Sequence, residues 1–341
     1  MNKVTISDIA REAGVSKATV SRVINKDYSK ASEDTIARIE SLVVKYNYRP
    51  SAVAQSLKTK KTKTIGVILS DVSNPFFSSL LQAVGRAGNA AGYNCYICDS
   101  SDDPELEETH IRSLIQRKID GLLLNPVLSS SNLYHELCHE HFPTVCLNRK
   151  PDDLDVSAVL MNNSSGTYMA AERLIKCRRK NVRLFIFTPE GRQPRVERIM
   201  GYKNAMHMYG YRSLAMNGVC YLPTDCGSET VAAVLHEMKQ RGQLPDAVIG
   251  GTSRITLMVY GAARRLGLRI PEDIAVLGYN EDIWSPYLEP ALTTIYQPAD
   301  DMGTVAMTHL LSLIADPVQR AETICLDPKI IVRKSCGTAD I

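Results

Sequence analysis

The stretch TISDIAREAGVSKATVSRVIN, residues 5–25, predicts two short helices joined by a tight turn. In its first half, apolar residues recur at the spacing of one helical face, and Thr5 or Ser7 can cap the start of that helix. Gly14 is suited to the left-handed residue of the turn, and Ser16 can cap the second helix. The second helix turns valines and an isoleucine inward and small or basic side chains outward. This arrangement is typical of a helix-turn-helix.

A third helix, from a Ser32 cap to about Tyr46, would close a three-helix core. The charge of this region supports a contact with nucleic acid. Residues 1–63 hold 13 lysines and arginines against six aspartates and glutamates, a formal charge of +7, whereas the whole chain carries +3 and the remainder therefore −4. A basic head on a mildly acidic body suits phosphate contact. Charge alone would equally fit a solvated basic face, so the turn geometry carries the prediction of DNA binding.

A short apolar helix is expected next, in the run YRPSAVAQSLK at residues 48–58, followed by the linker TKKTK. Pro50 suits the first turn of a helix, and small residues form a narrow apolar seam. A helix of about two turns is marginal in isolation, so we expect it to order on binding. Small residues around one protruding leucine, Leu57, suit a minor-groove wedge that unstacks a base step and bends the duplex.

These motifs resemble the LacI/GalR family of bacterial repressors, on the runs at residues 4–10, 13–16, 19–25 and 48–57, and the likeness continues through nearly the whole chain. The resemblance implies that Lys17, Ala18 and Arg22 read bases in the major groove. It also implies that Leu57 from each subunit of a homodimer intercalates at the centre of a palindromic DNA operator. The implied phosphate contacts, which fix register rather than sequence, come from Ser16, Thr19, Ser21 and Asn25. The predicted DNA-binding residues are completed by Thr5, Ser51, Ala54 and Lys58.

Length, hydropathy and cysteine content limit the class of protein. A chain of 341 residues suits a head plus a body of one or two lobes. It has no apolar run of about 18 residues and no signal peptide, because the N-terminus is itself the helix-turn-helix, so we expect a cytoplasmic protein without a membrane partner. Nine scattered cysteines fit a reducing compartment rather than a disulfide framework. The Cys95-x-x-Cys98 pair lies in an apolar strand pattern, which sends the two sulfurs to opposite faces.

The body alternates short apolar runs with helical patterns. Strands are expected at residues 65–69, 94–98, 121–124, 144–147, 184–187, 247–249 and 275–278, and helices at 76–91, 105–117, 166–176, 196–209 and 228–241. This alternation predicts an α/β body of doubly wound parallel sheets, and the number of strands favours two lobes. The resemblance implies lobes like those of periplasmic sugar-binding proteins, with the chain crossing between them near Met161, Pro290 and Glu322.

The predicted organisation follows from these boundaries. An all-α helix-turn-helix domain occupies residues 1–48, and a hinge helix with its linker occupies 49–63. The first lobe comprises 64–161 with 291–322, and the second lobe 162–290 with 323–341. Ligands of such sheets lie outside the carboxyl ends of the strands, here between the lobes. The C-terminus has no heptad tail, which favours a dimer over a coiled-coil tetramer.

Two loops are candidates for binding a small effector. Asn-Pro and nearby serines after the first body strand make a strand-to-helix turn, with two aromatic residues at the helix start. Adjacent helical residues point about 100° apart, so one of the two phenylalanines belongs to the core. The resemblance implies that this loop covers the effector, which nominates Asp71, Phe76 and Phe77.

The run PEGRQPRVER at residues 189–198 places three arginines within seven residues at a helix start. Guanidinium groups there can clamp an anion or a diol, reinforced by the positive end of the helix. The alternative is a solvated basic face paired with Glu190 and Glu197. The resemblance assigns Arg192 and Arg198 to the effector.

The predicted effector is anionic. By the resemblance, Asn280 stands where an aspartate commonly binds sugar hydroxyls, and Asn148 stands where some relatives carry aspartate. Amides in place of carboxylates lower the negative charge of the site while the arginines stay. We therefore predict a sugar acid or sugar phosphate rather than a neutral sugar, in a regulator of carbohydrate metabolism. The run GTSRITL at residues 251–257 lacks the family's usual Asn-Asp pair and looks similar to the branch that senses keto-sugar acids.

Enzyme classes are the main alternatives. The run HELCH contains a literal HExxH, with His135 and His139 on one helical face and Glu136 between them, as a zinc hydrolase requires. However, it precedes a predicted strand where the family shows a variable surface helix, and His141 is the one further ligand nearby. An enzyme on the same lobes and a transport-type binding protein are the other rivals, and the missing signal peptide argues against transport. The interpretation we adopt is a DNA-binding regulator with no catalytic residue, metal or cofactor.

Overall fold

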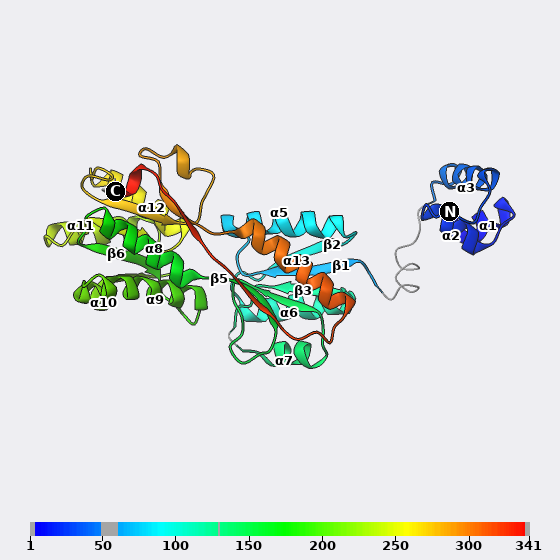
Figure 1. Ribbon diagram of the computed structural model, residues 1–341, viewed down its shortest axis with the longest axis horizontal. Helices are drawn as coiled ribbons and strands as arrows, with labels where there is room; N and C mark the ends of the chain where they lie inside the picture. The colour runs from blue at the N-terminus through cyan, green and yellow to red at the C-terminus, as the bar shows by residue number, and fades with distance from the viewer. Residues whose placement is uncertain (1–3, 49–60, 129, 338–341) are drawn as a thin grey trace. The chain divides into compact units, whose positions relative to one another are not determined.

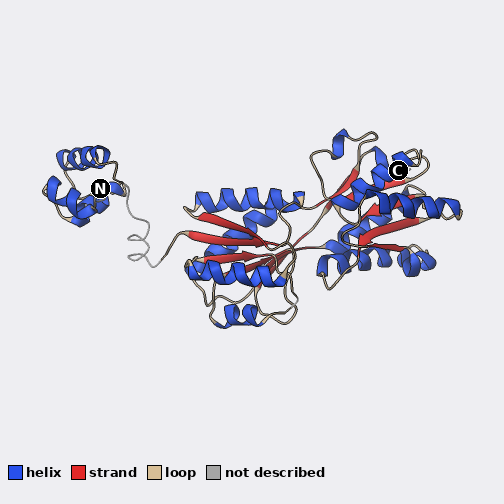
Figure 2. Cartoon of the chain, turned by 180° about the vertical axis from the view of Figure 1, so that it is seen from behind, coloured by secondary structure: helices blue, strands red, loops and turns tan. Residues whose placement is uncertain are grey.

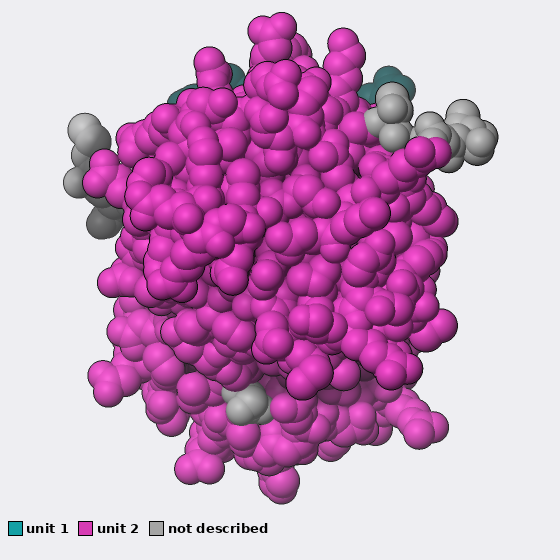
Figure 3. All heavy atoms as spheres, turned by 90° about the vertical axis from the view of Figure 1, so that its left-hand side faces the viewer, with its two compact units in different colours: residues 1–62 teal, residues 63–341 magenta. Residues whose placement is uncertain are grey.

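The computed structural model describes residues 4–48, 61–128 and 130–337. The chain forms two units, residues 1–62 and 63–341, which Figure 3 colours separately. The predicted DNA contacts of the hinge lie outside the described residues and stay predictions; they are those of Ser51, Ala54, Leu57 and Lys58.

Over residues 4–48 the head has three helices (Figure 1), α1 (Ile6–Ala13), α2 (Lys17–Ile24) and α3 (Glu33–Lys45). The backbone N–H of Thr5, at the N-cap of α1, donates to the carboxylate of Asp8 at 3.0 Å. Gly14 then takes the left-handed conformation, with φ of 67°. Ser16 caps α2 by accepting a hydrogen bond from the backbone N–H of Thr19 at 3.1 Å. The prediction of two capped helices about a glycine turn is confirmed.

Apolar residues from all three helices form one core in the head, and its buried members are Ile9, Ala10, Ala13, Val20, Val23, Ile39 and Leu42. Because the valines of α2 lie in this core, the opposite face of α2 is left to solvent. The third helix closes the core as expected.

The first lobe is a six-stranded parallel sheet in the order β11-β5-β4-β3-β1-β2. The strands are β1 (Thr64–Leu69), β2 (Asn94–Asp99), β3 (Gly121–Leu124), β4 (Thr144–Leu147), β5 (Ser157–Met161) and β11 (Thr323–Leu326). Helices α5 (Pro75–Ala90) and α13 (Ala299–Ala315) pack on one face, while α6 (Pro104–Gln116) and α7 (Asn132–His139) pack on the other (Figure 1). Arg86 on α5 and Asp300 on α13 form an ion pair of 2.6 Å between these two helices.

The second lobe repeats this plan of a sheet between helices (Figure 2), and its strand order is β12-β10-β9-β8-β6-β7. Its strands are β6 (Val182–Phe187), β7 (Val219–Leu222), β8 (Ala247–Gly250), β9 (Ala275–Tyr279), β10 (Thr293–Tyr296) and β12 (Lys329–Ile331). One face is covered by α8 (Asn163–Lys176) and α9 (Gln193–Met208), with α10 (Arg212–Asn217) beside α9, and the other by α11 (Ser228–Gln240) and α12 (Ser253–Arg265). The predicted fold class is confirmed, with β12 alone running antiparallel to its neighbour.

Two of the three expected crossings between the lobes were misplaced. Strand β10 pairs with β9 in the second sheet, so the chain leaves that lobe after Tyr296 and not near Pro290. Strand β11 pairs with β5 in the first sheet, so the last crossing follows Leu326 and not Glu322. Both strands have only four residues, and a four-residue pattern does not specify which sheet it joins. The remaining crossing lies between the end of β5 at Met161 and the start of α8.

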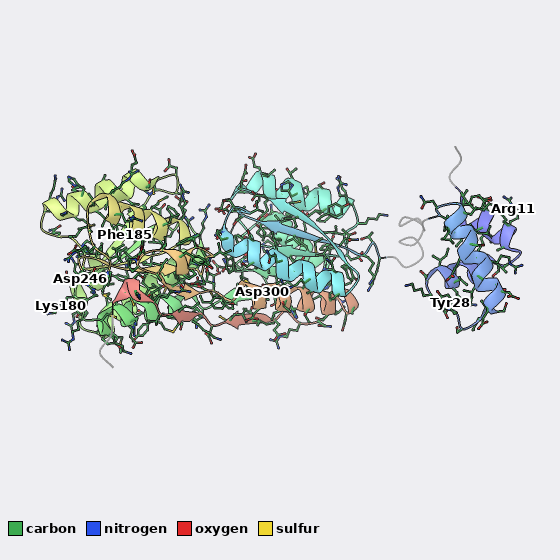
Figure 4. All side chains as sticks on the ribbon, turned by 90° about the horizontal axis from the view of Figure 1, so that it is seen from above. Arg11, Tyr28, Lys180, Phe185, Asp246 and Asp300 are labelled. Carbon is green, nitrogen blue, oxygen red and sulfur yellow. The ribbon has the colours of Figure 1, made fainter. Side chains whose placement is uncertain are left out.

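The end of the second sheet where the strands begin is fixed by Asp246, labelled in Figure 4. Its carboxylate accepts hydrogen bonds from the backbone N–H groups of Lys180 at 2.7 Å and Asn181 at 2.9 Å. These bonds join the loop before β6 to the start of β8. The opposite, carboxyl end is free to carry binding groups.

The cysteines behave as the sequence predicted. All nine are unpaired thiols. Cys95 packs against the cluster under α5 and α13, whereas Cys98 packs against the cluster under α6 and α7. The two sulfurs of the CxxC therefore lie on opposite faces of β2. Among the described residues, no helix is long and apolar enough to cross a membrane.

One carboxylate is buried in the core of the first lobe. Glu107 on α6 is 2% exposed, and it accepts hydrogen bonds from the hydroxyl of Tyr134 and from the backbone N–H of Val127 at 3.0 Å. Burial raises the pKa of Glu107 to about 7, against the effect of these bonds. The folded protein therefore binds this proton more tightly than the unfolded chain does.

We expect the stabilising effect of Glu107 to be complete below about pH 4.5 and to be lost as the pH rises through about 7. The difference in unfolding free energy between wild type and Glu107→Gln should accordingly fall by about 3 kcal/mol over that interval. Chemical denaturation of both proteins at several pH values measures this difference. A difference that does not change with pH would contradict the assignment.

Candidate functional site

A cavity of about 600 Å³ lies between the two lobes, at the carboxyl ends of their strands. We call it the interlobe cavity. Its lining is rich in charge, with five arginines, Arg149, Arg192, Arg195, Arg198 and Arg254, and three aspartates, Asp71, Asp102 and Asp282. The lining therefore carries an excess of positive charge, as the sequence led us to expect.

Most of the predicted effector residues line this cavity, namely Asp71, Phe77, Asn148, Arg192 and Arg198. Phe76 does not line it: this ring packs edge-to-face on Phe77, with the ring centroids 5.3 Å apart, and both rings are 3% exposed. Asn280 also lies outside the lining, because its amide turns inward to donate to the carboxylate of Asp282 at 2.8 Å. The nomination of Phe76 and Asn280 is corrected accordingly, and Asp282 takes the place of Asn280 at the cavity wall.

The turn between β1 and α5 is organised by its own side chains. The carboxylate of Asp71 accepts from the backbone N–H of Ser73 at 3.0 Å. Asn74 caps α5 by accepting from the backbone N–H of Phe76 at 3.1 Å, and Pro75 fills the first helical turn. This local bonding explains why an Asn-Pro sequence at this point starts a helix at the edge of the cavity.

An ionic bridge crosses the cavity through Asp102. Its carboxylate lies 3.0 Å from Arg149 of the first lobe and 3.1 Å from Arg192 of the second. Burial raises the pKa of Asp102, but the charges of the two arginines outweigh burial, so that the pKa lies below its ordinary value. Asp102 is therefore ionised and joins the lobes. Arg192 has a second carboxylate partner, Glu190, at 2.9 Å.

Arg198 is held rigidly in the wall of the cavity and is only 7% exposed. It donates from Nε to the side-chain oxygen of Asn163 at 2.9 Å and from Nη1 to the carbonyl of Gly251 at 2.8 Å. Its guanidinium lies 3.7 Å from the ring centroid of Tyr279, which is a close cation–π contact.

Arg195 and Arg254 flank the ring of Phe187, with their guanidinium carbons 5.6 and 5.5 Å from its centroid. Arg195 donates to the carbonyl of Thr188 at 2.7 Å, and Arg254 donates to that of Cys226 at 2.7 Å. Burial, followed by the neighbouring positive charges, lowers the pKa of Arg195 to about 10. These two arginines are thus fixed mainly by neutral partners.

The cavity also offers acceptors and a fluorophore. Asn148 Oδ1 and Asp282 Oδ2 are buried acceptor atoms with no hydrogen-bond partner among the described residues. One comes from each lobe, and hydroxyl groups are the complementary donors. Burial raises the pKa of Asp282. The single tryptophan of the chain, Trp284, lies in the same lining.

Several lining residues were missed from the sequence, namely Asp102, Arg149, Arg254, Asp282 and Trp284, and Arg195 was noted in its run of arginines but not assigned to the effector. Most of them follow a strand within a few residues, so the signal that could have found them is position at a strand's carboxyl end. That signal marks many loops, and it does not select the charged residues that face one another.

The head presents the predicted DNA-reading side chains. Lys17, Ala18 and Arg22 are exposed on α2, and Asn25 is exposed at its end. In the described part of the chain, neither Lys17 nor Arg22 forms a salt bridge, whereas Arg11 on α1 (labelled in Figure 4) pairs with an aspartate at 2.6 Å. The charges on α2 are therefore available to a nucleic acid.

The remaining predicted DNA-binding residues of the head are partly or fully exposed to solvent, and some of them also cap helices. Thr5 and Ser16 sit at the N-caps of their helices, and the hydroxyl of Ser16 lies 2.9 Å from that of Thr19. Ser21 is partly exposed next to the basic residues of α2. Phosphate contacts by these residues stay predictions.

The HExxH helix has no zinc-site geometry. His135 lies 3.0 Å from the carboxylate of Asp153 on the surface, and His139 is in the last turn of α7. Over the described ranges, no three histidine, cysteine or acidic side chains are grouped to hold a metal ion.

Known proteins match both units of the chain. A model of bacterial regulatory proteins of the lacI family matches residues 5–51, and a periplasmic binding protein-like domain matches residues 171–336. The HTH-type transcriptional regulator KdgR of Bacillus subtilis (strain 168) is 32% identical over 334 residues, which cover 97% of each chain. This chain belongs to the LacI family. The ribose operon repressor of Escherichia coli (strain K12) is a second relative of this regulator, 32% identical over 97% of this chain and 99% of that protein.

The fold of this LacI-family protein is also similar to that of a solved protein–DNA complex. The lac repressor dimer bound to operator and the anti-inducer ONPF matches with a TM-score of 0.84 at 24% identity, over 99% of this chain and 100% of that one. The protein is therefore a DNA-binding transcriptional repressor with an effector-binding body, and not an enzyme, since its relatives are transcription regulators. The zinc hydrolase alternative is wrong.

Proposed function

We propose that this protein is a homodimeric repressor of carbohydrate genes that binds a palindromic operator under the control of an acidic sugar. The observation that carries the effector class is the charge of the interlobe cavity, where five arginines face three aspartates. Two relatives support a role in sugar metabolism, because one is named a ribose operon repressor and a solved LacI-family regulator from Enterococcus faecium is titled with bound ribose.

The lining suits a sugar acid or sugar phosphate in two ways. Asn148 and Asp282 offer acceptors from opposite lobes to the hydroxyl groups of a sugar. The arginines offer donors to a carboxylate or phosphate. A ligand that touches both lobes can favour one arrangement of the lobes over another, and that difference in affinity is what couples it to DNA binding.

The proposed dimer would cover apolar side chains on the sheet edges. Strand β2 ends the first sheet and exposes Tyr96 and Ile97 by 53% and 52%, and β7 ends the second sheet and exposes Tyr221 by 48%. Exposed apolar residues on edge strands favour association. A two-fold dimer matches a palindromic operator, because each head then reads one half-site.

Binding of the effector should change the fluorescence of Trp284, because this residue is the single tryptophan and lines the cavity. We expect sugar acids or sugar phosphates, but not the parent neutral sugars, to change its emission and to alter the affinity for operator fragments. Fluorescence titration followed by a gel-shift assay with each active compound measures both. Tight binding of neutral sugars alone would reject the acidic effector, and an absence of any preferred genomic fragment would reject the regulator.

A further inference from the structure

We propose that the anionic group of the effector binds between Arg195 and Arg254, beside the ring of Phe187. This subsite deepens the function proposed above and rests on it. The group that it would take is a carboxylate or a phosphate, whose several oxygens can accept from two guanidinium groups at once.

The other three arginines of the cavity are already engaged. Arg149 and Arg192 share the carboxylate of Asp102, at 3.0 and 3.1 Å, so that an anion would have to displace this aspartate. Arg198 donates two hydrogen bonds to protein oxygens, and its guanidinium carbon lies over the ring of Tyr279, 3.7 Å from the ring centroid. Arg149 and Arg192 thus already have a counter-ion, and Arg198 already has fixed protein partners.

Arg195 and Arg254 differ because their charges are poorly balanced. In the ranges that the structure describes, Arg254 has no salt bridge, and the nearest carboxylate oxygen to Arg195 is that of Glu190 at 3.8 Å. Glu190 is itself bonded to Arg192 at 2.9 Å. Backbone carbonyls, including that of Thr224 at 3.2 Å from Arg254, hold the two guanidinium groups in place without neutralising them. The result is a pair of pre-oriented cations. Among the described residues Arg254 has no salt bridge, and Arg195 has a single distant one, to a carboxylate that also bonds Arg192.

The surroundings increase the attraction for an anion. Arg195 lies in the first turn of α9 and Arg254 in the first turn of α12, and both side chains line the cavity, so the positive ends of two helices add to the local potential. The ring of Phe187 lies within 5.6 Å of both guanidinium carbons, and an apolar neighbour strengthens electrostatic attraction. Burial, followed by the charge of Arg192, lowers the pKa of Arg195, and a bound anion would oppose both effects.

The test compares matched probes that differ in one charge: gluconate against glucose, and ribose 5-phosphate against ribose. Binding is followed by Trp284 fluorescence and by the melting temperature. We expect wild type to prefer the anionic member of each pair. Arg195→Gln and Arg254→Gln should each lose roughly tenfold or more of the affinity for that member, with the affinity for the neutral member unchanged.

Three control variants make the test specific. Arg241→Gln removes the same charge from an exposed position of the same lobe, and its binding should match wild type. Arg195→Lys and Arg254→Lys keep the charge, so each should retain most of the preference, which separates loss of charge from a failure to fold.

The outcomes distinguish the subsite from the proposed function. If Arg195→Gln and Arg254→Gln lower the affinity for both members of a pair equally, or if Arg149→Gln alone selectively lowers it for the anion, the subsite is overturned while the acidic effector stands. If wild type prefers the neutral members, or binds none of the four probes, the subsite and the acidic effector both fall. The gel-shift assay with operator fragments then decides the DNA-binding function separately.

Discussion

Replacing Arg198 by alanine is expected to abolish the response of operator binding to the effector and to lower the unfolding free energy by roughly 3 kcal/mol. The side chain is buried, and its removal leaves the side-chain oxygen of Asn163 and the carbonyl of Gly251 without their donor. It also removes the cation stacked on Tyr279. An arginine with this many fixed contacts shapes the wall of the cavity, so no neighbouring residue can replace it.

The control for Arg198→Ala is an arginine of the same lobe that lies outside the cavity lining. Arg183 on β6 donates to the side chain of Asn181 at 3.1 Å and to the carbonyl of Asn217 at 2.7 Å. Arg183→Ala should reduce stability while the effector response persists. Denaturation curves and gel-shift assays with and without effector measure the two properties separately. A normal effector response in Arg198→Ala would remove this residue from the site.

The head could be predicted almost completely because its signals are local. Its caps, its left-handed glycine and its apolar periodicity all fall within 21 residues, and each has a direct consequence for the backbone. The body strands with continuous apolar runs, such as β1 and β3, were predicted for the same reason. Such runs suit strands that are buried on both faces of a parallel sheet.

The crossings between the lobes could not be predicted in this way. Strands β10 and β11 carry patterns as short as those of many loops, and their assignment depends on which sheet has an unpaired neighbour. Which sheet a strand joins is a property of the tertiary structure and cannot be read from the residues of the strand. The lobe boundaries predicted near Pro290 and Glu322 therefore failed even though the fold class was right.

The site was predicted in part, for a related reason. Sequence pattern placed Arg192 and Arg198 at a helix start, and both line the interlobe cavity. It gave no means to see that Asp102, 90 positions earlier, bonds to Arg192. The sequence likewise left open which of the two adjacent phenylalanines faces the cavity. In the structure both rings are buried, and Phe77 lines the cavity while Phe76 does not.

Replacing Arg22 by alanine is expected to weaken binding to the operator by about 1–3 kcal/mol and to relax base preference at one position of each half-site. Arg22 is exposed on α2, lies outside the apolar core of the head and forms no salt bridge within the described residues, so its removal should leave the fold intact. Arg38→Ala is the matched control, because it removes the same charge from an exposed position on α3. Loss of a phosphate contact would weaken binding to all sequences alike, whereas loss of a base contact changes the preference. Binding to operators substituted at each base pair in turn separates these effects, and an unchanged base preference in Arg22→Ala would show that another residue reads that position.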